Sequence, residues 1–92
     1  MTPSNKKAYL RPQDVKPAKA VRVLLFLNTA QTAREIVDAI KLAGGRDVGI
    51  RVAQSILNRR VQLGKFTDLK QVTSVAQVGA RRFTKIVEGL GK

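Results

Sequence analysis

The sequence predicts an all-α fold, a bundle of about four to five helices, on three observations. Glycines stand where helical stretches end, at Gly44-Gly45 and at Gly64. Outside residues 21–27, no stretch reads as a strand. Apolar residues recur at the i, i+3, i+4, i+7 spacing of an amphipathic helix, as in Ala33, Ile36, Val37 and Ile40.

Local signals place each expected helix along the chain. Pro17 followed by Ala and Lys favours a helix across Val21–Leu27, whereas the apolar and β-branched residues of that run favour a strand. Of the two, we expect the helix. Asn28 or Thr29 is expected to cap the second helix. The expected later elements are a helix over about 29–43, a helix from Val48 or Gly49 to Leu63, a short helix after Thr67-Asp68, a turn over 75–79 and a helix over about 80–90.

The chain is expected to divide into two parts. Residues 1–16 carry two prolines and scattered charge, which is typical of a flexible basic arm. Residues 17–92 form the folded domain, with one helical hairpin over about 29–63 and a second over about 67–90. No apolar run reaches the roughly 20 residues of a membrane span, and no signal peptide is expected. The absence of Cys fits a reducing compartment.

The charge points to a polyanionic partner. The chain holds 18 Lys and Arg against 6 Asp and Glu, a formal charge of +12. Residues 21–92 carry 13 of the basic residues and five of the acids, so the excess belongs to the folded part. A field of this sign attracts nucleic acid, acidic protein surfaces or anionic lipid. A generic solubilising surface is the other interpretation, although such surfaces usually mix both signs.

An internal repeat appears when the chain is offset by thirty residues. The stretch 48–57 then lies over 78–87, and both copies read as a turn that ends in Val-Gly and leads into a helix. The identical residues are Val48 and Val78, Gly49 and Gly79, Arg51 and Arg81, and Ile56 and Ile86.

Several short motifs, in order, resemble those of a tandem helix-hairpin-helix domain of the type found in competence proteins that receive incoming DNA. They are Leu27-Asn28-Thr29-Ala30, Ala53-Gln54-Ser55-Ile56-Leu57-Asn58-Arg59-Arg60, Gly64-Lys65-Phe66-Thr67-Asp68-Leu69 and Val75-Ala76-Gln77-Val78-Gly79. The resemblance covers about residues 27–90. It implies two hairpins that hold phosphates on the two sides of a minor groove without reading bases.

The hairpins have a physical reason to bind phosphate. A helix N-terminus presents backbone N–H groups and partial positive charge, and a glycine there lets a phosphodiester approach. The candidate DNA-binding residues are Gly49, Ile50, Arg51 and Arg46 at the first hairpin and Gly79, Ala80, Arg81 and Arg82 at the second. The family usually has a further glycine where Asp47 and Gln77 stand here, and the Asp47 carboxylate makes the second hairpin the better site.

Each of these residues also has a purely structural interpretation. In this interpretation, Gly49 and Gly79 are glycine because two helices approach each other closely there. Arg51 and Arg81 would be ordinary solvated positions, and Arg59 and Arg60 are expected to be charges at the end of their helix. Phe66 and Phe83 are expected in the core.

The predicted function is therefore non-enzymatic, sequence-tolerant binding of DNA, double-stranded because only three Phe and one Tyr are available for stacking on single strands. The alternative is a protein-interaction or scaffolding domain. Without His or Cys, and with six scattered acids, the chain offers little for a catalytic base or a metal site, so no enzyme activity, metal or cofactor is expected.

Overall fold

The computed structural model describes residues 9–45 and 48–91, and over these residues the protein is all-α. A 3-10 turn, η2 (Pro12–Asp14), is followed by α1 (Pro17–Thr29), α2 (Ala33–Leu42), α3 (Ile50–Leu63), α4 (Leu69–Thr73) and α5 (Ala80–Leu90). The prediction of an all-α fold is thus confirmed, and the ambiguous run 21–27 is helical.

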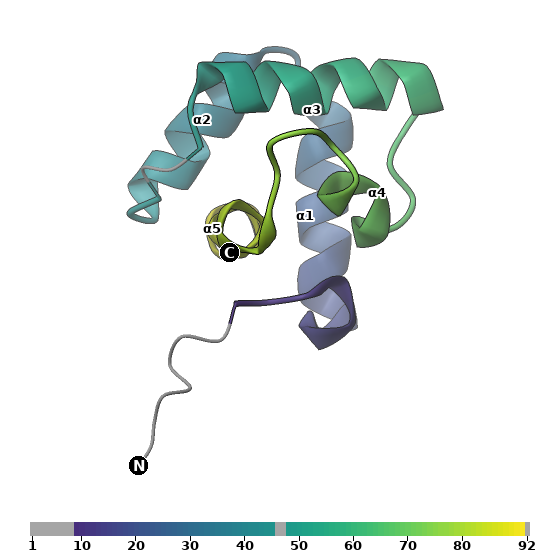
Figure 1. Ribbon diagram of the computed structural model, residues 1–92, viewed down its shortest axis with the longest axis vertical. Helices are drawn as coiled ribbons and strands as arrows, with labels where there is room; N and C mark the ends of the chain where they lie inside the picture. The colour runs from purple at the N-terminus through teal and green to yellow at the C-terminus, as the bar shows by residue number, and fades with distance from the viewer. Residues whose placement is uncertain (1–8, 46–47, 92) are drawn as a thin grey trace.

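The helices form two hairpins and one additional helix. α2 and α3 are joined through residues 43–49, and α4 and α5 through residues 74–79. α5 packs against α1, α2 and α4, while α3 lies across the top of the view and packs on α2 and α1 (Figure 1). The described core is apolar, with no buried polar or charged residue, and its largest side chains are Phe66 and Phe83.

The first helix is longer than the sequence predicted, and the second starts later. Asn28 and Thr29 belong to α1, where the Thr29 hydroxyl donates to the Leu25 carbonyl at 2.8 Å. The N-cap of α2 is Thr32, which forms a capping box with Glu35. That box satisfies two first-turn amides reciprocally, so it fixes the start of α2 at Ala33.

The other predicted boundaries agree with the structure. Asp68 caps α4, and its carboxylate accepts from the Lys70 amide at 2.9 Å. α5 spans the predicted 80–90. Gly64 ends α3 with a φ of 89°, a positive value that glycine adopts readily.

Half of the predicted flexible arm packs on the domain. Residues 1–8 lie outside the described residues. The Leu10 amide donates to the Thr84 hydroxyl of α5 at 2.8 Å, and the Leu10 and Val15 side chains pack against the core. The folded unit therefore begins earlier than residue 17.

Candidate nucleic-acid interface

The two hairpins end in helix starts of the same geometry. Gly49 is the N-cap of α3 with φ −92° and ψ −177°, and Gly79 is the N-cap of α5 with φ −91° and ψ −175°. Each glycine carbonyl accepts the first helical hydrogen bond, from Ala53 N at 3.0 Å and from Phe83 N at 2.9 Å. The thirty-residue sequence repeat is thus also a repeat of backbone conformation.

Neither conformation nor internal packing explains why these two residues are glycine. Their φ values are accessible to any residue, so the backbone conformation does not require glycine at either position. A Cβ built on Gly49 or Gly79 meets no atom within 4 Å, which also excludes close helix approach as the reason. The glycines instead leave open space in front of the two helix starts.

The remaining helices begin differently. α2 and α4 have side-chain caps, Thr32 and Asp68, each within a capping box. α1 begins with Pro17 at its first position, where a residue without an N–H suits an uncapped amide. α3 and α5 each follow a glycine N-cap, and no side chain of the described residues caps them. Ser, Asn or Asp would supply the missing acceptor, so the hairpins lack a cap that the same chain provides elsewhere.

Arginines follow both glycines, although not all are placed for the same role. Arg51 and Arg81 occupy the second position of α3 and α5, and both are exposed. Arg82 is half-buried, and its Nη1 donates to the Gln77 carbonyl at 2.7 Å across the second hairpin. Arg82 therefore braces the turn as well as adding charge beside it.

Gln77 adopts a backbone conformation that normally favours glycine. Its φ is 75°, the only positive φ of a non-glycine residue within the described part of the chain. A positive φ is energetically unfavourable for an L-residue other than glycine. The hydrogen bond from Arg82 to the Gln77 carbonyl therefore helps to hold a strained turn. At the first hairpin the equivalent Asp47, and Arg46 before it, lie outside the described residues.

The first hairpin has a cavity beside it that the sequence did not predict. It measures about 350 Å³ and is lined by Arg34 and Lys41 of α2 and by Val48, Gly49 and Ile50 at the start of α3. Ile50 is 52% exposed, and Ala80 is exposed at the matching position of α5. Arg34 and Lys41 are seven residues apart and so share a face of α2, a spacing that could have indicated them.

Several residues of the recognised motifs are structural. The Asn28 side-chain amide pairs twice with the backbone of Phe66: Phe66 N donates to Asn28 Oδ1, and Asn28 Nδ2 donates to Phe66 O, both at 2.8 Å. Arg60 Nη1 donates to the carbonyls of Leu27, at 2.7 Å, and Ala30, at 2.5 Å. Arg60 thus lies in the last turn of its own helix, as expected, and in addition caps the C-terminus of α1.

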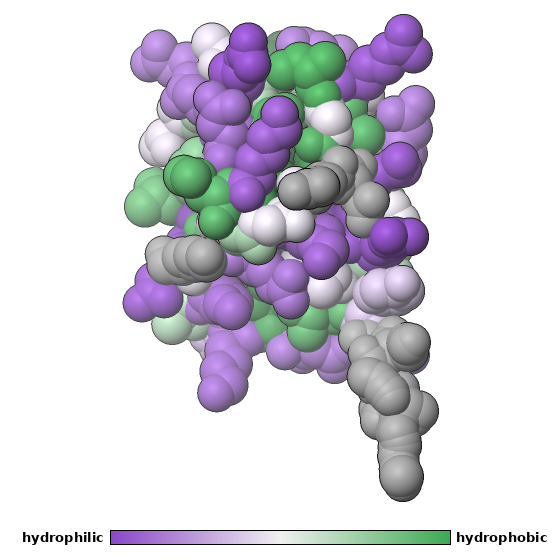
Figure 2. All heavy atoms as spheres, turned by 90° about the vertical axis from the view of Figure 1, so that its left-hand side faces the viewer, coloured by the Kyte–Doolittle hydropathy of each residue, from purple (hydrophilic) through white to green (hydrophobic). Residues whose placement is uncertain are grey.

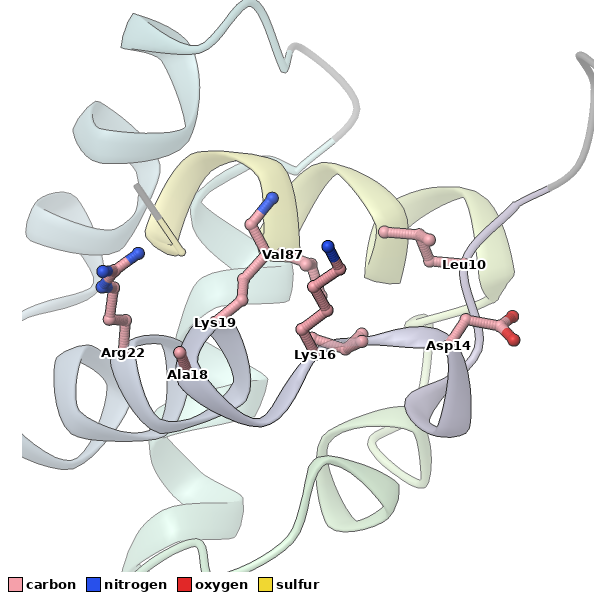
Figure 3. Close-up of a pocket in the computed structure, with 8 residues that line it drawn as sticks. Leu10, Asp14, Lys16, Ala18, Lys19, Arg22 and Val87 are labelled. Carbon is pink, nitrogen blue, oxygen red and sulfur yellow. The ribbon is translucent and has the colours of Figure 1, made fainter.

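A second cavity lies outside both hairpin turns. It measures about 370 Å³ and sits between the residues before α1, the first half of α1 and Val87 of α5. Lys16, Lys19 and Arg22 project from the α1 side, and Asp14 lies at the opposite end (Figure 3). A Cβ at Gly91 would lie 2.5 Å from the Cγ of Lys19, so the Lys19 stem covers the C-terminus of α5. This position suits a cation because of the helix dipole.

The surface seen from the α2 side carries mainly hydrophilic side chains, with apolar groups in separate small areas (Figure 2). No helix in the described ranges is long and apolar enough to cross a membrane.

Comparison with known proteins gives no match, whether with protein-family models, curated proteins or solved structures.

Proposed function

We propose that this protein is a non-enzymatic, sequence-tolerant DNA-binding module that holds backbone phosphates at its two hairpins. The observation that supports it best is the pair of helix starts at Gly49 and Gly79. Both lack a side-chain cap, both have open space where a Cβ would stand, and both are followed by an exposed arginine two residues on.

The chemistry of a helix start suits a phosphate. First-turn amides have no acceptor four residues earlier in the helix, and the macrodipole adds partial positive charge. A phosphodiester oxygen can accept from such amides where no side-chain acceptor competes for them. Backbone contacts of this kind carry no sequence information, so affinity is expected to vary little between sequences.

The surface chemistry favours duplex over single strands. Phe66 and Phe83 are buried and Phe26 is partly buried against the core, so Tyr9 is the one exposed aromatic side chain. Binding of single strands normally relies on several aromatic platforms. The charge of +12 supplies the attraction to a polyanion.

Fluorescence anisotropy of a labelled duplex over a range of salt concentrations tests the proposal. With four neutralised phosphates, the slope of log affinity against log salt is about −3.6. The double variant Arg51→Glu/Arg81→Glu removes one side-chain contact at each hairpin, which brings the slope to about −1.8 and weakens binding to all duplexes alike.

The control carries the same change of charge elsewhere. Lys65 and Lys70 are exposed and lie outside both hairpin turns, so Lys65→Glu/Lys70→Glu matches the loss of net charge. Equal weakening by the two double variants would show that the overall field, and not the hairpins, binds DNA. A salt-independent affinity would refute the phosphate mechanism itself.

A protein-binding role is the second candidate, because α1 exposes apolar side chains on one face. Val21 is 63% and Leu25 61% exposed, and Ala18 is exposed one turn before. An unpartnered apolar stripe of this kind fits a protein partner. Val21→Lys/Leu25→Lys would abolish such an interaction and leave duplex binding intact.

A further inference from the structure

A polar groove runs between α3 and the loop that leads into the second hairpin. It measures about 340 Å³. One wall is the polar face of α3, and the other is residues 74–76. The polar side chains along it are Ser55, Asn58, Arg59, Gln62 and Ser74. No acidic residue of the described chain lines it, so a negatively charged group would meet no repulsion there.

The amide side chains of the groove are already oriented as donors. Asn58 Oδ1 accepts from Gln54 Nε2 at 3.1 Å, and Gln62 Oε1 accepts from Arg59 Nη1 at 3.2 Å. Because both oxygens are engaged, each amide presents its NH2 group. Within the described residues neither NH2 group has an acceptor.

Arg59 has unused hydrogen-bonding capacity. Its Nε is buried and donates to no acceptor in the described part of the chain. A buried donor without a partner is costly, and a guanidinium has five donors in a planar fork that suits phosphate. The guanidinium can exchange its contact with Gln62 for an anion and gain a charge-assisted bond.

The groove is continuous with the hairpins. Its loop wall, residues 74–76, directly precedes Gln77 and Gly79, and its α3 wall belongs to the helix that carries Arg51 at its second position. Arg51 and Arg59 are eight residues apart, about 12 Å along the helix. Successive phosphates of one DNA strand advance about 3.4 Å along the duplex axis, so this interval spans about three to four of them.

We propose that the groove beside Arg59 is a third phosphodiester site, which binds the backbone of the nucleic acid held at the hairpins. This inference rests on the proposed function and extends it. It makes α3 the path along which one strand passes between the two hairpins, with Arg59, Asn58 and Gln62 as donors. The contact remains independent of base sequence.

The test compares two variants that lose the same charge. Arg59→Gln removes the guanidinium from the groove, and Arg22→Gln removes one from exposed α1. We expect Arg59→Gln to reduce duplex affinity about tenfold at low salt and the salt slope by about 1, with less than about a twofold change for Arg22→Gln. Equal effects of both variants would overturn the groove site.

A measurement on the wild-type protein keeps the test independent of how the variant folds. In ¹⁵N-resolved spectra, the Arg59 Nε–H and the Asn58 and Gln62 side-chain NH2 signals are expected to shift during titration with a duplex. If these signals stay unmoved while backbone amides near Gly79 shift, the hairpin proposal stands and the groove proposal fails.

Failure of the proposed function gives a different pattern. If the wild-type protein binds no oligonucleotide, titration with dimethyl phosphate at millimolar concentrations examines the groove alone. Shifts confined to the groove side chains would retain it as a phosphodiester site, and spectra without such shifts would refute it.

Discussion

Replacing Gly79 by aspartate should move stability and DNA binding in opposite directions. The backbone at Gly79 is extended, with φ −91° and ψ −175°, and a Cβ there meets nothing within 4 Å. Aspartate therefore fits without strain, and its carboxylate reaches the first-turn amides of α5 as an N-cap. The same carboxylate occupies the position proposed for a phosphate.

The expected stabilisation is small but measurable. A better cap contributes a few tenths of a kcal/mol over glycine, the charge gains about 0.3–1 kcal/mol from the helix dipole, and the unfolded chain loses glycine's freedom. Together these predict about 0.5–1 kcal/mol, which in a domain of this size raises Tm by about 2–8 °C. Loss of a phosphate held by amides should cost about 1.5–3 kcal/mol of binding, or about tenfold to a hundredfold in affinity.

Two variants separate the causes. Gly79→Ser caps without charge, so it should stabilise less and weaken binding less than aspartate. Gln13→Asp places the same charge on the η2 segment, which packs on α4 outside both hairpin turns, and should leave affinity within about twofold. Thermal unfolding by circular dichroism and duplex anisotropy give both readouts. A stabilised Gly79→Asp variant with unchanged affinity would refute contact between phosphate and the α5 amides.

Three further substitutions test the framework that holds the hairpins, each by thermal unfolding. Asn28→Ala removes both 2.8 Å hydrogen bonds to the backbone of buried Phe66. It should lower the free energy of unfolding by about 2 kcal/mol and Tm by about 8–16 °C. A fall in Tm below about 2 °C would contradict the structural role of Asn28. Gln77→Gly relieves the strain of the positive φ of 75°, and the greater conformational entropy of glycine in the unfolded chain offsets part of this gain. The variant should be more stable by about 0.5–1 kcal/mol. A less stable variant would mean that the turn is unstrained. Gly89→Ala brings a Cβ to 2.8 Å from the Ile40 Cα where α5 crosses α2, and should lower the free energy of unfolding by about 1–3 kcal/mol. The control Gly79→Ala places its Cβ in open space, so it should cause no loss of stability through packing.

The helices were predictable because their signals are local. The spacing of Ala33, Ile36, Val37 and Ile40, the cap Asp68 and the terminator Gly64 act within one or two turns, and the structure confirms them. The start of α2 was missed because the two expected caps, Asn28 and Thr29, both belong to α1. Asn28 is engaged 38 residues away by Phe66, and that contact leaves the cap to Thr32.

The candidate site was predictable only in part, since it depends on contacts between distant elements. The Val-Gly repeat indicated both helix starts, but not that Arg82 would brace the Gln77 carbonyl. Arg60 looked like a charge at the end of α3, yet it reaches α1, thirty or more residues away. The groove beside Arg59 requires α3 and residues 74–76 to meet, which no local pattern specifies.

The distribution of polar bonds explains how the fold can leave the two repeated helix starts uncapped. Capping boxes stabilise the starts of α2 and α4, and Arg60 caps the C-terminus of α1. The Asn28 side chain hydrogen-bonds the backbone of Phe66 in the segment before α4. These interactions lie outside the hairpin turns themselves. Each missing cap at Gly49 and Gly79 costs at most a few tenths of a kcal/mol against Ser or Asp, so stability alone would favour filling them. The chain provides a side-chain cap at the starts of α2 and α4 but none at the repeated starts of α3 and α5. The local preference for a capping side chain is therefore broken at the two places where an external acceptor would bind. The arginine that follows each glycine adds the charge that such an acceptor, a phosphate, would require.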